Sequence, residues 1–415
     1  MKNHRPTLAT ITGIILLGVA LQSAVLFFAL DPHKLYWKDA RIYYKSAVRL
    51  HEGHPFSTTD DSAGMWHPPG YSYILSYMMK VAGTNVLNLR LFHVALFPVF
   101  LVLLYRLGAV WRGERTGRIA MILGALYPPY IYMSLSLYAE SLLIYMYVGI
   151  ALLVFLLARR PTYLVLIPLV LLISVAVMMR PTALILSIVA ALVMLHGERS
   201  EWKRALAMGL LVIAVPGALA TGWCIRNSHV HGRFTFSATA AGTLLANYNE
   251  GASWRDKKVS LPEEIQQKLS SASTFEEKDK IRTDAVRKFI REHPFWSMKI
   301  ALLQSIASWS PWPVTMSTGG HAGWKYKGGA AVPFGLLCVF GIWGIVRERK
   351  DRFVQSLVLL MILNTVANGV AGVSYRYRVV TDFALILTAS VILDGILKRC
   401  RRRPGDGKAV RHGDG

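Results

Sequence analysis

The sequence predicts an all-α membrane protein, a polytopic bundle of about 10–11 spanning helices with further helices on its outer surface. The first observation is composition: 53% of the 415 residues are hydrophobic and 17% are charged, whereas a soluble domain carries about 25% charged residues. The mean hydropathy is +0.37. The second observation is the recurrence of apolar stretches of spanning length, separated by short basic connections.

Ten apolar stretches have, or approach, the length of about 20 residues that a spanning helix needs. They cover residues 8–30, 89–109, 119–137, 141–158, 163–179, 181–196, 205–225, 330–346, 353–371 and 379–397. The first stretch exceeds the apolar core of about 7–15 residues found in a cleaved signal peptide. We therefore expect residues 8–30 to stay in the protein as its first span.

The distribution of basic residues predicts the orientation of these spans. Lysine and arginine gather in short connections and in the tail, at residues 112–118, 159–160, 199–204, 347–352 and 398–403. Short cytoplasmic connections are enriched in basic residues. If all five segments lie inside, the spans alternate consistently, so both termini are expected on the cytoplasmic side.

The remaining sequence forms two long outer segments, residues 31–88 and 226–329. Each contains an apolar piece, at 70–83 and at 295–312. The first is short for a span, and either one, if it crossed, would reverse the sidedness of a basic connection. We expect residues 70–83 to form a helix on the membrane surface and residues 295–312 to form an interfacial or re-entrant helix.

We expect an N-terminal membrane module at 1–225 with its first outer loop at 31–88, an outer segment at 226–329, and a C-terminal membrane module with a basic tail at 330–415.

The net charge is +23, and it restricts the classes of partner. Nucleic-acid binding is disfavoured, because the basic residues lie between apolar spans and form no soluble domain. Contact with anionic lipid and handling of an anionic substrate both remain open. The three cysteines show no metal or disulfide spacing. Asp60 and Asp61 leave a divalent metal as an alternative, although no cofactor is predicted firmly.

Two acidic residues lie next to predicted spans at the outer side. Asp39 follows the first span, among tryptophan and tyrosine residues, and a carboxylate there can take a proton from a hydroxyl group. The alternative is a solvated loop carboxylate paired with Lys38 or Arg41. Glu140 precedes a span, where an acid is either functional or simply favourable for the helix dipole.

Basic residues at the outer side are the next candidates. His67 lies between Trp66 and two prolines, where it either contacts a phosphate or sits in a rigid turn. Guanidinium groups suit phosphate binding, and short outer loops are normally poor in arginine. The outer arginines are Arg180, Arg226, Arg376 and Arg378, and anchoring to lipid headgroups is the alternative for each.

The order of these motifs resembles the polyprenol-dependent membrane glycosyltransferases of the GT-C superfamily. In chain order they are Asp39-Ala40, His67-Pro68-Pro69-Gly70-Tyr71, Tyr138-Ala139-Glu140-Ser141, Arg180-Pro181, Arg226-Asn227 and Arg376-Tyr377-Arg378. The resemblance covers nearly the whole chain. It points to the bacterial family 39 group, which is related to protein O-mannosyltransferases and aminoarabinose transferases.

This resemblance implies a bacterial inner (plasma) membrane enzyme that transfers a sugar from a polyprenyl-phosphate donor at the outer face. Its first-loop carboxylate falls on Asp39, the expected base, and its second acid falls on Glu140. The donor phosphate is expected at His67, Arg180, Arg226, Arg376 and Arg378. The expected substrate contacts are Tyr43, Trp66, Tyr71 and Tyr377. The acceptor is an envelope lipid, glycan or protein.

A transporter or flippase of an anionic lipid is the main alternative, and a noncatalytic assembly protein is a third. Transporters place their binding residues at the midplane, on broken helices of repeated halves. Here the polar candidates gather at the outer edge, and no internal repeat is seen. These features favour an enzyme.

Overall fold

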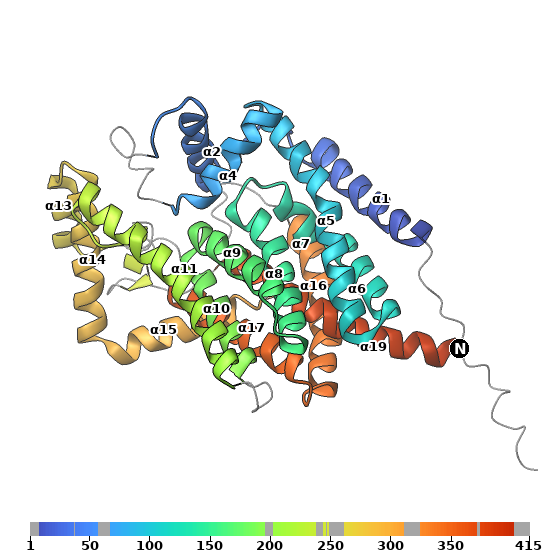
Figure 1. The fold of residues 1–415 in the computed structure, drawn as a ribbon. Coiled ribbons are helices and arrows are strands. Elements are labelled where there is room, and N and C mark those ends of the chain that lie inside the picture. Colours follow the sequence, from blue (N-terminus) through green and yellow to red (C-terminus); the bar gives the residue numbers. More distant parts are fainter. Residues whose placement is uncertain are drawn as a thin grey trace, which may run out of the picture.

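The computed structural model describes residues 8–36, 38–56, 67–195, 202–237, 244–245, 247–248, 261–310, 324–371 and 374–401. Every regular element within these ranges is helical, which confirms the predicted all-α class. Figure 1 shows the helices gathered in one bundle, with α1 at one side and α13 and α14 at the other.

The first half of the chain supplies a first group of helices. They are α1 (Leu8–Ala24, continued by the π turn η1, Val25–Ala29), α2 (Lys38–His51), α4 (Gly70–Ala82), α5 (Val86–Arg112), α6 (Glu114–Leu126), α7 (Pro128–Ser134), α8 (Ala139–Arg159), α9 (Tyr163–Met179), η2 (Pro181–Ala183), α10 (Leu184–Leu195) and α11 (Trp202–His231). The second half supplies α13 (Glu263–Ser271), α14 (Phe275–Glu292), α15 (Pro294–Ala307), α16 (Trp324–Arg347), α17 (Arg352–Ala371), α18 (Tyr375–Val379) and α19 (Asp382–Arg401).

Within the described residues, five helices are long and apolar enough to cross a membrane: Leu8–Ala29, Val86–Arg112, Ala139–Arg159, Trp202–His231 and Arg352–Ala371. Three shorter apolar helices accompany them, at Tyr163–Met179, Pro181–Leu195 and Ala331–Arg347. The apolar stretch at 119–137 is divided between α6 and α7, because Pro128 starts a new helix. The two expected surface helices correspond to α4 and α15, with 13 and 14 residues.

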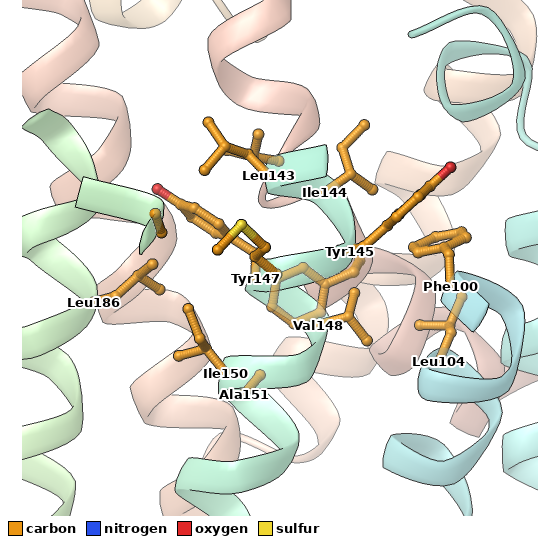
Figure 2. Close-up of a cluster of buried hydrophobic side chains, with 14 of the residues drawn as sticks. Phe100, Leu104, Leu143, Ile144, Tyr145, Tyr147, Val148, Ile150, Ala151 and Leu186 are labelled. Carbon is orange, nitrogen blue, oxygen red and sulfur yellow. The ribbon is translucent and has the colours of Figure 1, made fainter. Parts of the chain in front are cut away.

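Helix α8 forms the centre of the bundle. It buries residues around its whole circumference, as expected for a helix that is apolar on every face. Figure 2 shows Tyr145 directed toward Phe100 of α5, while Tyr147 lies on the side of Leu186 of α10. The rings of Tyr145 and Phe100 stack with their centroids 5.3 Å apart. The surrounding helices fix the position of α8, and the two ends of α8 are therefore fixed as well.

Small residues allow other helices to approach closely. A Cβ atom at Gly117 of α6 would lie 2.5 Å from the carbonyl oxygen of Tyr105 on α5, so only glycine fits there. Gly344 of α16 meets the backbone of Thr388 on α19 in the same way. Backbone contact through small residues is the usual means by which helices pack in membranes, where the hydrophobic effect does not drive their association.

The second outer segment packs as a small helical unit against the bundle. Thr274 begins α14 with a capping box that it shares with Glu277. Arg233, just after α11, forms an ion pair with the buried Asp279 of α14. Tyr248 donates a hydrogen bond of 3.2 Å to the carbonyl oxygen of Val370 at the end of α17. These contacts hold the segment near the C-terminal ends of α11 and α17.

Candidate functional site

Asp39 and Arg376 meet at the centre of the candidate site, although 337 positions separate them in the sequence. Asp39 lies in the first turn of α2. Arg376 lies in the short helix α18, which Ser374 precedes in an extended conformation. The Nη2 atom of Arg376 donates a hydrogen bond of 2.8 Å to Oδ2 of Asp39. The partner of Asp39 is thus Arg376, whereas Arg41 donates instead to the carbonyl oxygen of Leu35.

His67 lies against the same carboxylate. Its ring stacks on Tyr43 of α2, with centroids 4.6 Å apart and planes inclined by 22°. The Nε2 atom of His67 is 3.8 Å from Oδ1 of Asp39, beyond hydrogen-bond distance. This nitrogen is buried and has no hydrogen-bond partner among the described residues. A buried polar atom without a partner is uncommon, and a bound ligand would satisfy it.

The glycine of the His67-Pro68-Pro69-Gly70 motif has a packing role. A Cβ atom on Gly70 would lie 2.7 Å from the backbone carbonyl of Met178, at the end of α9. The start of α4 therefore rests directly on the end of α9. This contact fixes the position of His67, three residues upstream, relative to Arg180, two residues downstream of Met178.

Glu140 and Arg180 form a second acid–arginine pair. Glu140 lies in the first turn of α8, and Leu137 just before it has a φ angle of 55°, which is rare for a residue other than glycine. Arg180 is extended, because the ring of Pro181 disfavours a helical residue before it. The sequence predicted this helix break, and the structure confirms it. The two side chains form an ion pair in which Glu140 is 4% exposed and Arg180 is 18% exposed.

Tyrosine rings connect the two pairs into one group. The guanidinium carbon of Arg180 lies 3.6 Å from the centroid of the Tyr377 ring. Arg376 lies 4.4 Å from the ring of Tyr138 and 5.5 Å from that of Tyr377. Cations are stabilised over aromatic faces, most strongly where water is excluded. We refer to Asp39, Glu140, Arg180 and Arg376 as the charged quartet.

The electrostatics of the quartet keep Asp39 ionised. Burial raises the pKa of this carboxyl, but the positive charge of Arg376, joined at low pH by that of protonated His67, outweighs burial, and the pKa lies below its usual value of 3.8. Burial lowers the pKa of His67 below its usual value of 6.5. At neutral pH the site therefore holds a carboxylate beside a neutral imidazole.

The phenol of Tyr71 lies behind this group. Its ring contacts Tyr43 edge to face, with centroids 5.0 Å apart. Its hydroxyl is 3.4 Å from Nε2 of His93 and accepts a hydrogen bond of the same length from Ser141. Tyr71 therefore supports Tyr43 and, through it, His67.

Arg378 does not join the quartet. It forms an ion pair of 3.2 Å with Asp382, and Tyr127 donates a hydrogen bond of 2.7 Å to the same carboxylate. Its guanidinium also lies 3.4 Å from the ring of Phe334. Residues two apart on a helix point in different directions, so Arg376 and Arg378 reach different surroundings.

Arg226 is also held elsewhere. It donates a hydrogen bond of 2.7 Å to the carbonyl oxygen of Phe56 and lies 4.9 Å from the ring of Trp223. Trp66, an expected substrate contact, lies outside the described residues, as do Asp60 and Asp61. No group of three or more potential metal ligands gathers within the ranges that the structure describes.

Sequence reasoning missed two members of the site. One is Tyr138, whose ring contacts the guanidinium of Arg376; the sequence marks it only as part of the motif around Glu140. His93 was read as part of an apolar span, and its polar side chain inside that span was the one available signal.

Comparison with known families gives a match over part of the chain. The model of the family described as dolichyl-phosphate-mannose-protein mannosyltransferase matches residues 66–223. The matched range includes His67, Glu140 and Arg180, and it leaves out Asp39 and Arg376. No curated protein matches the sequence.

Solved structures give matches over nearly the whole chain. The apo oligosaccharyltransferase of Archaeoglobus fulgidus is 14% identical, with a TM-score of 0.54 over 96% of this chain and 52% of that one. Archaeal oligosaccharyltransferase AglB from the same organism, in complex with an inhibitory peptide and a dolichol-phosphate, is 14% identical, with a TM-score of 0.50 over 94% and 51%. ArnT from Cupriavidus metallidurans, bound to undecaprenyl phosphate, is 15% identical, with a TM-score of 0.43 over 92% and 78%.

The chain spans about half the length of the two oligosaccharyltransferase structures. At this level of identity the likeness concerns the fold. Together with the matched family model, it confirms the resemblance that the order of the motifs indicated: this chain has the fold of the GT-C superfamily of membrane glycosyltransferases.

Proposed function

We propose that this protein is a membrane glycosyltransferase that moves a sugar from a polyprenyl-phosphate donor to a hydroxyl group of an envelope acceptor. The observation that carries the proposal is the joining of Asp39, His67 and Arg376 from three distant parts of the sequence. They bring a carboxylate, an unsatisfied buried nitrogen and a cation into one small site. The fold supports the same class of reaction, since AglB is described in complex with a dolichol-phosphate.

Asp39 is the proposed base because it is the more accessible of the two acids. Its side chain is 30% exposed, against 4% for Glu140. The Asp39 carboxylate takes the proton of the acceptor hydroxyl while the acceptor oxygen forms its bond to the anomeric carbon of the sugar. The bond from that carbon to the donor phosphate breaks on the opposite side, and polyprenyl phosphate leaves. The step inverts the configuration and forms no covalent intermediate with the protein.

Arg376 is the proposed contact of the departing phosphate. A guanidinium carries five N–H donors, and Arg376 uses Nη2 for Asp39 and Nε for Ser374. Its Nη1 makes no hydrogen bond within the part of the chain that the structure describes. A preorganised cation beside a developing negative charge lowers the barrier without reorganisation during the reaction. His67 is the second proposed contact, through its unpartnered Nε2.

Glu140 is the proposed positioning residue for Arg180. The Glu140 side chain is almost fully buried, so it has little room to accept a proton from a substrate. Arg180 in turn covers the face of Tyr377, next to Arg376. In this arrangement Glu140 holds the second arginine in place, and Arg180 adds positive charge on the phosphate side of the site.

The substitution Asp39→Asn tests the base assignment. Cells that lack the protein are complemented with wild type, Asp39→Asn or the control Asp31→Asn, and their envelope glycolipids and glycoproteins are compared by mass spectrometry. We expect the wild type and the control to restore a mass that differs by one sugar. Asp39→Asn should lose about 10²–10⁴-fold in rate, the usual contribution of a general base.

Binding of undecaprenyl phosphate to purified Asp39→Asn should persist, because Asn removes a negative charge and leaves Arg376 in place. Full conversion by Asp39→Asn would refute the base assignment. If the protein instead moves lipid without changing any envelope mass, the transporter alternative is correct.

A further inference from the structure

A cavity lies at the other end of the bundle, away from the charged quartet. It has a volume of about 450 Å³ and is enclosed by the C-terminal ends of α5, α8 and α10 and the N-terminal end of α17. Helix α8 connects the two places, since Glu140 lies in its first turn and Arg159 is its last residue. With a rise of 1.5 Å per residue, these two residues are about 28 Å apart along the helix axis.

The inner wall of the cavity is apolar. Phe155 of α8, Val189 and Val193 of α10, and Leu359 of α17 line it. All four come from helices that are apolar enough to lie within a membrane. The volume falls within the range of about 300–1,000 Å³ that is typical of small-molecule sites. The wall therefore suits a hydrocarbon chain.

The rim of the cavity is basic. Arg112, Arg159 and Arg352 line it together with one acid, Asp351, which leaves two net positive charges. Asp351 is already held, because it accepts hydrogen bonds of 2.5 Å from Arg112 and 3.0 Å from the Trp111 indole. Arg112 also pairs with Glu348 at 2.6 Å. Arg112 is therefore matched by acidic partners, whereas Arg159 forms no ion pair within the described residues.

Arg159 is placed to act at the boundary between the rim and the wall. Its guanidinium lies 4.4 Å from the centroid of the Phe155 ring, one turn back on the same helix. Arg159 is exposed at the C-terminal end of α8. A basic residue that rests on the apolar wall suits a ligand with an anionic head and an apolar tail.

We propose that this cavity binds one anionic phospholipid, with its phosphate at Arg159 and an acyl chain along Phe155 and Val193. Basic pockets between spanning helices are a recognised way to hold anionic headgroups, and they occur on the cytoplasmic side. The connections at 112–118, 159–160 and 347–352 are the ones whose charge predicts that side. The site is separate from the sugar-transfer site, so it does not depend on the proposed function.

Native mass spectrometry of the purified full chain tests this proposal. Dioleoyl phosphatidylglycerol, dioleoyl phosphatidylcholine and glycerol phosphate are titrated in parallel. We expect phosphatidylglycerol to bind in preference to phosphatidylcholine, and glycerol phosphate to leave the bound lipid in place. Equal binding of the two lipids would overturn the anionic selectivity, and displacement by glycerol phosphate would overturn the role of the acyl chain.

Variants locate the binding. Arg159→Gln should weaken phosphatidylglycerol about fivefold, corresponding to the ~1 kcal/mol contributed by one basic residue near an anionic lipid. The matched control is Arg160→Gln, which removes the same charge from the next residue, outside the cavity lining. Val193→Trp fills the cavity without a change in charge and should also weaken binding, with folding checked by thermal unfolding. If Arg159→Gln and Val193→Trp bind like wild type, the lipid lies elsewhere and the proposal fails.

Discussion

The substitution Gly70→Ala should impair the reaction without touching any reacting group. A Cβ atom at this position would lie 2.7 Å from the carbonyl carbon and oxygen of Met178, while ordinary contact begins at 3.4 Å. The start of α4 must therefore move away from α9 by about 0.7 Å, the difference between these two distances. The neighbouring atoms belong to backbone, so a side-chain rotation cannot relieve the contact. Overpacking of this kind costs about 1–3 kcal/mol in the free energy of unfolding.

The displacement also changes the site, because His67 lies just before α4 and Arg180 lies just after α9, on opposite sides of this contact. A misplacement of about 1 Å can reduce a rate by about 10²-fold, so we expect Gly70→Ala to lose roughly tenfold to a hundredfold in sugar transfer.

The assay measures the sugar-modified envelope mass in complemented cells, normalised to the amount of protein in the membrane, together with the thermal unfolding midpoint in detergent. Gly222→Ala in α11 is the control, since a Cβ atom there meets nothing within 4 Å. Wild-type transfer and stability in Gly70→Ala would refute the reasoning.

Two further predictions concern the charged quartet. Glu140→Gln should lower the free energy of unfolding by about 3–5 kcal/mol, because it leaves the largely buried Arg180 without its acidic partner. The double variant Glu140→Gln/Arg180→Met should recover part of that loss. Additive effects of the two substitutions in unfolding titrations would contradict a direct pair. The pH profile of transfer is the other test. Asp39 must be ionised to act as a base and its pKa lies below 3.8, so the activity due to this group is present at neutral pH and lost only as the pH falls through that low value. Arg376→Gln removes the main cause that lowers the pKa, and the acid limb should move toward neutral pH; Arg41→Gln, which removes an arginine that does not contact Asp39, should leave the limb in place. An unmoved limb in Arg376→Gln would show that Asp39 does not limit the rate.

Local signals in the sequence predicted much of the fold. Proline marks the break after Arg180, and the first apolar stretch forms one continuous helical segment from Leu8 to Ala29. The structure also brings together Asp39, His67 and Arg376, which the resemblance assigned to one site. The helix break and the first helix depend on residue type and on neighbours in the chain, which is the information that a single sequence contains.

The partners of the charged residues could not be predicted in the same way. Arg376 and Arg378 look equivalent in sequence, but the short helix α18 directs one to Asp39 and the other to Asp382. Glu140 was equally well explained by function or by the helix dipole, and its partner Arg180 lies 40 positions away. Tertiary packing decides such pairings, so they appear only in three dimensions.

The ring of Tyr377 lies against two arginines, and this has a consequence for how the site can change. Arg180 and Arg376 both rest on that ring, and each is matched by a different acid. A substitution in one acid–arginine pair therefore alters the support of the other, and effects within such a group do not add. During evolution the residues of the two acid–arginine pairs would therefore have to change together. Tyr377 couples the two pairs, because its ring contacts the arginine of each.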